Sequence, residues 1–271
     1  MEKLREIMAD QILKKLEGFK VLLTEQFASK GKINSFIIDD VLDPDLATRI
    51  HKAFPDKSQM KKKKSLREYK NIAAQMNNYD PILEEAVYAF QDSRIVKIVG
   101  EITGLRELIP DELLYAGGIS LMSQGNFLNP HLDNSHNKDR SLYRVLNLLY
   151  YVTPDWKEEY GGNLELWDDG PHEKQRTIHS KFNRLVVMIT NQISVHSVSK
   201  VQIDGARCCV SNYYFSPIPA EQEHYFHVTS FYGRPEEKVK NVLLVVDSGV
   251  RNLIRKVFKK GVVKTKHIYK K

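Results

Sequence analysis

Residues 125–134 read Gly-Asn-Phe-Leu-Asn-Pro-His-Leu-Asp-Asn, and they place His131 and Asp133 two positions apart. On an extended segment, side chains two positions apart point to the same side of the chain. The imidazole and the carboxylate are therefore expected to face one point in space. Both groups are common metal ligands, so this stretch predicts the first part of a metal site inside a β-rich fold.

The chain around this stretch has the texture of an antiparallel β-protein. Runs rich in Val, Ile, Leu and Tyr alternate with turn signals about every ten residues, which is typical of sandwiches and barrels. These runs cover residues 119–122, 144–152, 163–167, 184–190 and 208–215.

The part before residue 112 is predicted to be mainly helical. Apolar residues at helical spacing predict an amphipathic helix over residues 1–29, through Ile7, Met8, Ile12, Leu16 and Phe19. A short strand is expected over 36–38. Asp-Pro pairs are typical of helix starts, because aspartate caps the helix and proline suits its first position. They predict helices after Asp43 and Asp80, and a further helix is expected around 95–102, ending at Gly104.

Charge is distributed unevenly along the chain. The net charge is +7, yet residues 249–271 hold nine Lys/Arg and no acid, whereas residues 1–248 hold 32 basic and 34 acidic residues. The basic character thus belongs to the C-terminal end, which argues against nucleic-acid binding by the main domain. A second basic segment, residues 56–70 with Lys61–Lys64, is expected to be a solvated loop.

The apolar stretches, the first residues and the cysteines of the chain indicate where the protein is located. Apolar stretches such as Val242–Val246 hold five residues, too few for a membrane span, and the first residues lack the apolar core of a signal peptide. The two cysteines, Cys208 and Cys209, are adjacent, so no disulfide framework is expected. A cytoplasmic location is the expectation.

His196 is the candidate for a third ligand, because it follows one predicted strand and precedes another. Two histidines and one carboxylate form a facial triad that leaves open positions on Fe(II) for substrate and oxygen. A His-x-Asp pair is by itself a weak signal, since a surface histidine beside a turn-capping aspartate has the same pattern. His136, His172 and His179 are rival ligands that lack the rest of the motif.

Four ordered segments raise the specificity of this pattern. Residues 125–134 resemble the first iron-binding segment of prolyl-4-hydroxylase-like 2-oxoglutarate/Fe(II) oxygenases. Residues 144–152, with Asp155-Trp156 and 161–164, are similar to the strands and turn that follow it in that family. His196 and Gly205-Ala206-Arg207 resemble the distal part of the site, and residues 36–42 resemble the strand before the family's first helix.

The resemblance implies a double-stranded β-helix (jelly roll), an all-β core with flanking helices of α+β class. It implies that His131, Asp133 and His196 bind Fe(II), and that Arg207 binds the C5 carboxylate of the cosubstrate 2-oxoglutarate through its bidentate fork. Other residues of the cosubstrate pocket are then Tyr151, Ser211 and Asn147. A tyrosine often found upstream in the family is replaced near that place by Met122.

The implied function is a dioxygenase that uses O2, with ascorbate as a further cofactor the family allows, and releases succinate and CO2. The substrate is expected to be a prolyl or other amino-acid residue, free or peptidyl. An oxygenase acting on a sugar or biosynthetic intermediate, and a non-catalytic jelly-roll binding module, are the alternatives. The expected divisions are an N-terminal helix over 1–30, the oxygenase domain over 31–235, and a basic helix and tail over 236–271.

The C-terminal helix carries an apolar stripe beside its cations. The stripe, formed by Val250, Leu253, Ile254, Val257 and Phe258, is expected to pack on the jelly roll or on a second subunit. The alternative is an amphipathic helix on an anionic surface. Residues from Lys264 onward are expected to be free to contact an acidic partner.

Overall fold

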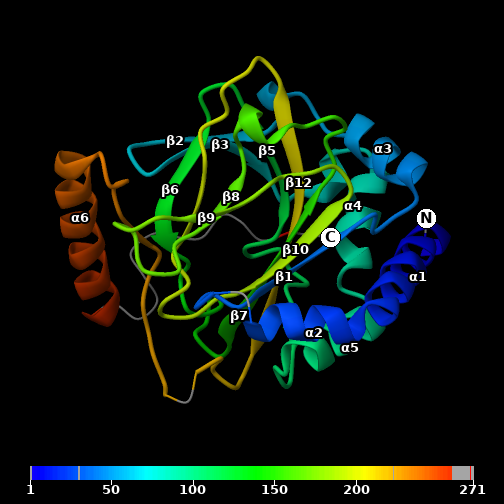
Figure 1. Ribbon diagram of the computed structural model, residues 1–271, viewed down its shortest axis with the longest axis horizontal. Helices are drawn as coiled ribbons and strands as arrows, with labels where there is room; N and C mark the ends of the chain where they lie inside the picture. Colours follow the sequence, from blue (N-terminus) through cyan, green and yellow to red (C-terminus); the bar gives the residue numbers. More distant parts are fainter. Residues whose placement is uncertain (1, 30, 222, 258–268, 270–271) are drawn as a thin grey trace.

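Antiparallel strands form the centre of the molecule and join in one curled sheet (Figure 1). The computed structural model describes residues 2–29, 31–221, 223–257 and 269, and in these residues the sheet has 13 strands. The strands are β1 (Ser35–Asp39), β2 (Lys61–Lys64), β3 (Glu68–Ala73), β4 (Ile109–Pro110), β5 (Gly118–Ser123), β6 (Phe127–Leu132), β7 (Tyr143–Tyr151), β8 (Leu164–Leu166), β9 (Arg176–Ile178), β10 (Arg184–Ile189), β11 (His196–Val198), β12 (Ala206–Ser216) and β13 (Ser230–Phe231).

The sheet folds over on itself at β3. Its strand order is β1-β10-β7-β12-β5-β3-β6-β11-β8-β9, with β2, β4 and β13 attached at the sides. Strand β3 pairs with β5 through Asn71–Ala73 and with β6 through Glu68 and Tyr69, so it joins the two halves. Residues from both halves line one cavity between them. This arrangement confirms the predicted jelly roll, in which burial between the sheet halves holds the fold together.

Five helices lie on the side of the molecule where β1 and β12 are found (Figure 1). They are α1 (Glu2–Gly18), α2 (Lys20–Ser29), α3 (Pro44–Lys52), α4 (Pro81–Ala89) and α5 (Ser93–Thr103), while α6 (Lys238–Val257) stands at the opposite end. Helix α2 contacts β1 and α4 contacts β12. Asp43 and Asp80 cap α3 and α4 as predicted, and α5 ends at Gly104, whose φ of 72° is the left-handed conformation that glycine favours.

The single helix predicted over residues 1–29 is wrong in one respect, since the chain forms two helices that meet at Phe19. Glycine is a poor helix former, and Gly18 lies where α1 ends. Met8, Ile12 and Leu16 are fully buried as expected. Ile7 and Phe19 are exposed, so the buried stripe is narrower than predicted.

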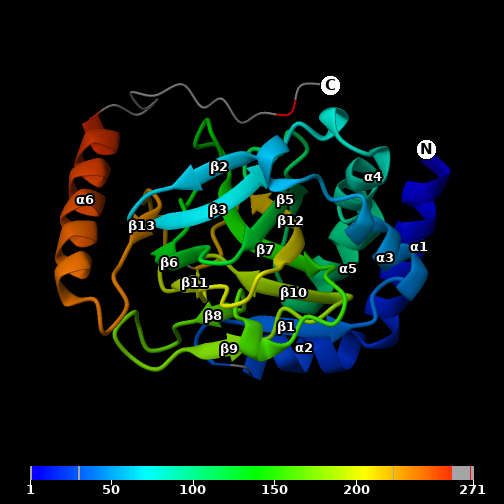
Figure 2. The same cartoon turned by 90° about the horizontal axis from the view of Figure 1, so that it is seen from above.

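The solvated loop predicted over residues 56–70 is also wrong. Residues 61–64 and 68–73 form the hairpin β2–β3, which continues the sheet beside β5 and β6. Figure 2 shows this hairpin lying across one edge of the jelly roll. Lysines hide the apolar alternation that usually reveals a strand, and the pairing is supplied by neighbouring strands distant in sequence.

Helix α6 contacts the body of the protein through a different face from the predicted one. Leu244 and Ser248 are buried, and Ser248 accepts a hydrogen bond from the backbone N–H of Phe231 on β13. The predicted stripe is exposed at Val250 (52%), Leu253 (65%) and Ile254 (39%). The prediction that it packs on the jelly roll is therefore wrong for these residues. The side chain of Val257 and all of Phe258 lie outside the described residues.

Tyr269 corrects the expectation that the chain from Lys264 onward is free. Its side chain is buried, its ring lies 6.2 Å from that of Tyr88, and its hydroxyl donates to Glu84 at 2.8 Å. The C-terminal part of the chain therefore contacts α4 through Tyr269. Separately, among the described helices, none is both long enough and apolar enough to cross a bilayer.

Candidate functional site

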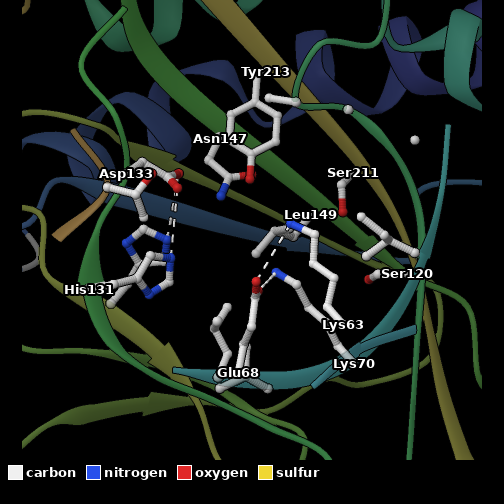
Figure 3. A pocket seen from close by; sticks show the side chains of 18 of the residues that line it. Lys63, Glu68, Lys70, Ser120, His131, Asp133, Asn147, Leu149, Ser211 and Tyr213 are labelled. Carbon is white, nitrogen blue, oxygen red and sulfur yellow. Dashed lines mark ion pairs between the residues drawn. The ribbon is translucent and has the colours of Figure 1, made fainter. Parts of the chain in front are cut away.

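A cavity of about 410 Å³ lies between the two halves of the jelly roll. Figure 3 shows that side chains reach it from strands distant in sequence: His131 and Asp133 on one side, Asn147 and Tyr213 on a second, and the β2–β3 hairpin on a third. Each of the seven residues predicted for the site lines this cavity, namely His131, Asp133, Asn147, Tyr151, His196, Arg207 and Ser211.

Two histidines and one aspartate converge at one end of the cavity. His131 on β6 lies directly opposite His196 on β11 in the antiparallel register, and their ring centroids are 4.2 Å apart. Asp133 follows β6, and its two oxygens lie 3.7 Å from the Nε2 atoms of His131 and His196. The three ligand atoms all lie within 4.8 Å of one another. The strand register thus brings together side chains 65 positions apart in sequence.

Backbone carbonyls fix the tautomer of both histidines. Nδ1 of His131 is 2.9 Å from the carbonyl oxygen of Asn129, and Nδ1 of His196 is 2.9 Å from that of Ser194. A carbonyl can only accept, so each Nδ1 must carry the proton and donate. Nε2 of each ring is then the nitrogen that faces Asp133. Two Nε2 atoms and a carboxylate that face one another form a donor set for a cation.

The protonation states suit metal binding as well. Burial and the nearby His196 lower the pKa of His131 to about 3, so this ring is neutral at physiological pH. Burial by itself would raise the pKa of Asp133, but the charge of Arg144 opposes burial most strongly, and the pKa lies well below its usual range. The carboxylate is therefore ionised. Among the described residues its buried Oδ2 accepts no hydrogen bond, although it forms an ion pair with a neighbouring arginine.

Arg144 is a part of the site that the sequence reasoning did not assign. Its Nη1 lies 3.3 Å from Oδ2 of Asp133, and both side chains are largely buried. The guanidinium also lies 4.5 Å above the ring of Tyr213. Arg144 therefore positions the Asp133 carboxylate through the same oxygen that lies 3.7 Å from Nε2 of His196. An arginine that begins a core strand was the only signal in the sequence.

Replacing Arg144 with glutamine should destabilise the metal-free protein by about 3–5 kcal/mol, because a buried carboxylate loses its fixed cation. Urea unfolding of the two proteins measures this loss. Manganese(II) should restore part of the stability, since a bound cation again compensates Asp133. Arg94→Gln, which breaks an exposed ion pair with Asp10, is the control and should cost much less. Equal losses in the two variants would contradict the assigned role.

Arg207 lines the same cavity as a buried cation. It is 4% exposed, no carboxylate among the described residues forms an ion pair with it, and its Nε has no hydrogen-bond partner. Its Nη2 lies 2.7 Å from Sδ of Met122, and its guanidinium lies 5.3 Å from the ring centroid of Tyr151. A buried guanidinium with unused donors fits an anionic ligand, and 2-oxoglutarate carries such a group.

The remaining predicted residues surround this space from β7 and β12. Asn147 is 2% exposed, and its buried Oδ1 has no hydrogen-bond partner in the described part of the chain. Ser211 is half-buried and lies near Cys209, with 3.7 Å between Sγ and the hydroxyl oxygen. The rival histidines lie elsewhere: His172 is exposed, His136 contacts Ser135, and His179 donates to the carbonyl of Trp156.

The central part of the chain matches a known protein family. Residues 117–215 match the sequence model of the 2OG-Fe(II) oxygenase superfamily. Prolyl 3-hydroxylase OGFOD1 of Mus musculus is 28% identical over 159 residues, which cover 52% of this chain and 28% of that protein. The chain thus matches less than a third of the length of this curated relative.

Solved structures share the fold at low sequence identity. A prolyl hydroxylase from Trichoplax adhaerens, solved with a hypoxia-inducible-factor peptide, has a TM-score of 0.54 at 19% identity and covers 75% of this chain and 92% of its own. The α-ketoglutarate-dependent epimerase SnoN of nogalamycin biosynthesis has a TM-score of 0.52 at 11% identity, covering 74% and 84%. Because these two proteins catalyse different reactions, the shared fold does not identify the reaction.

Proposed function

We propose that this member of the 2OG-Fe(II) oxygenase superfamily is an Fe(II)- and 2-oxoglutarate-dependent dioxygenase that hydroxylates a prolyl or other amino-acid residue. The observation that carries the proposal is the convergence of two imidazoles and one ionised carboxylate in a cavity that also holds the buried Arg207, with which no carboxylate of the described residues forms an ion pair. A non-catalytic binding module has no need of these four groups together.

In this proposal His131, Asp133 and His196 hold the iron, and Arg207 binds the C5 carboxylate of 2-oxoglutarate. Iron and 2-oxoglutarate together supply an oxidation in which O2 is consumed, succinate and CO2 are released, and a substrate C–H bond is hydroxylated. The protein contributes fixed ligands and orientation. The Asn129 and Ser194 carbonyls fix the two imidazole rings.

Three further residues complete the proposed cosubstrate pocket. The ring of Tyr151 lies against Arg207 and limits the directions that its fork can take. Ser211 offers a hydroxyl donor. The side-chain amide of Asn147 offers an NH2 donor and the acceptor Oδ1, which has no hydrogen-bond partner among the described residues. Ascorbate belongs to the proposal as a reductant that keeps the iron ferrous.

Succinate release tests the function. Purified protein with Fe(II), 2-oxoglutarate and O2 should form succinate, and a proline-containing peptide substrate should raise the rate and gain one oxygen atom by mass spectrometry. Sugars and free amino acids serve as the competing substrates. Absence of succinate in every mixture would contradict an enzymatic role and favour the binding module.

The domain division and the cellular setting stay proposals. The proposed units are residues 1–30, 31–235 and 236–271, in a protein of the cytoplasm, and the adjacent Cys208 and Cys209 are typical of a reducing compartment. The cations at 259, 260, 264 and 266 lie outside the described residues, and their charge supports an acidic partner for this segment. Changing these four lysines to glutamine should remove salt-sensitive binding to polyglutamate while succinate release stays unchanged.

A further inference from the structure

Two lysines face each other on the β2–β3 hairpin that borders the cavity. Lys63 lies directly opposite Lys70 in the antiparallel register. Like charges opposite each other destabilise a strand pair. Glu68 lies between them, with Oε1 3.5 Å from Nζ of Lys63 and Oε2 3.0 Å from Nζ of Lys70, as Figure 3 shows. One carboxylate forms ion pairs with two ammonium groups, so this cluster has a net charge of about +1.

The hairpin directs these charges into the cavity. Successive side chains of a strand point to opposite faces. Lys63, Glu68 and Lys70 line the cavity, whereas Lys62 and Lys64 lie 5.2 Å and 5.0 Å from the ring centroid of Tyr69. The run of four lysines is thus divided between two faces. Only one face looks toward His131 and Asp133 (Figure 3).

A second cluster beside the cavity also has two cations and one carboxylate. Asp247 of α6 forms ion pairs with Arg67 of the hairpin and with Arg251, the latter at 3.0 Å. Both arginines line the cavity. Together the two clusters set four cations against two carboxylates, so the mouth of the cavity is electropositive.

The groups of the proposed function do not neutralise this excess. In the proposed complex Asp133 and the C1 carboxylate of 2-oxoglutarate would compensate the iron and the C5 carboxylate would compensate Arg207, while Arg144 would share Asp133 with the metal. Burial lowers the pKa of Lys63, although its side chain is 35% exposed. Because Glu68 is the one carboxylate that forms ion pairs with both lysines among the described residues, an anion that enters the cavity would balance the remaining positive charge.

We propose that the substrate is peptidyl and presents an anionic side chain, a carboxylate or a phosphate, to Lys63 and Lys70 while its reacting residue lies at the metal site. The proposal rests on the proposed function and adds a substrate class to it. Ammonium groups bind either anion through charge-assisted hydrogen bonds. Arg67 and Arg251 extend the positive surface along which the flanking residues of the peptide lie.

Four fluorescent peptides test this proposal. Each has one central proline flanked by glutamate, phosphoserine, glutamine or lysine, and binding is followed by fluorescence anisotropy with Mn(II) and 2-oxoglutarate under anaerobic conditions. We expect the wild-type protein to bind the glutamate or the phosphoserine peptide about tenfold more tightly than the glutamine peptide, as one charge-assisted contact would give. The better of the two probes identifies the anion.

Variants on the two faces of the hairpin provide the matched comparison. Lys63→Gln and Lys70→Gln should lose the preference for the anionic peptide, whereas Lys62→Gln and Lys64→Gln should keep it. Glu68→Gln should increase the preference, because it removes the internal competitor for the lysines. The preference for the anionic peptide should thus change in opposite directions in Glu68→Gln and in the two lysine variants, which a general loss of folding would not produce.

Equal binding of the glutamine and anionic peptides by the wild-type protein, or no binding of any peptide, would overturn the proposal. The same loss in Lys62→Gln as in Lys63→Gln would overturn it too. Titrations of Mn(II) and 2-oxoglutarate distinguish failure of the proposed function from failure of the proposed substrate class. If the wild-type protein binds neither, the proposed function fails; if it binds both but does not discriminate between peptides, only the substrate class fails.

Discussion

Asp133→Asn should reduce metal affinity and metal-dependent succinate release about 100-fold or more. The exchange keeps the shape of the side chain but replaces an anionic ligand with a neutral amide. Removing one partner of a buried charge contact costs about 2–5 kcal/mol, and each 1.4 kcal/mol corresponds to a factor of ten. Metal content after dialysis and initial rates of succinate formation measure the two effects.

His196→Gln tests the same site from the neighbouring strand β11 and should give a similar loss. His172→Gln is the matched control, because His172 is exposed and outside the cavity. Unfolding curves for all variants show whether the fold is retained. Full turnover in Asp133→Asn or in His196→Gln would contradict the assignment of these residues as iron ligands.

Arg207→Ala should raise the concentration of 2-oxoglutarate required for half-maximal activity by a factor of about 30 or more. The far carboxylate would then lie in a buried space without its cation, at a cost of about 2–5 kcal/mol. Affinity for the metal alone should change little, because Arg207 is not one of the three converging ligands. Rates over a range of 2-oxoglutarate concentrations and metal titrations without cosubstrate separate these effects.

Arg207→Lys keeps the charge but loses the bidentate fork, so its requirement for 2-oxoglutarate should lie between those of the wild type and Arg207→Ala. This order distinguishes recognition of the carboxylate from a packing defect. An unchanged 2-oxoglutarate requirement in Arg207→Ala would show that another residue binds the C5 carboxylate.

Local signals in the sequence predicted the long core strands, such as β7, β10 and β12, and the starts of α3 and α4. The Asp-Pro pairs at 43 and 80 act through contacts within one turn, so neighbouring residues are sufficient to recognise them. The spacing of His131 and Asp133 is local as well. Their meeting with His196 was expected from a resemblance, because the register that pairs β6 with β11 is a long-range property.

Other features depend on contacts that no local pattern reveals. The β2–β3 hairpin has lysines where a typical strand has apolar residues, and β5 and β6 supply its pairing. The ion pair between Arg144 and Asp133 and the contact between Arg207 and Met122 join residues that are distant in sequence. For α6, the apolar stripe predicted the wrong contact face, because buried Ser248 and the ion pair of Asp247 with Arg67 orient the helix.

The coupling between metal and cosubstrate tests the central claim most directly. If His131, Asp133 and His196 hold the metal to which 2-oxoglutarate binds, each ligand must raise the affinity of the other by the same factor. Calorimetric titration of 2-oxoglutarate should therefore show tighter binding with Mn(II) than without it, and Asp133→Asn should remove the difference. Equal binding of 2-oxoglutarate with and without Mn(II) in the wild-type protein would contradict the account.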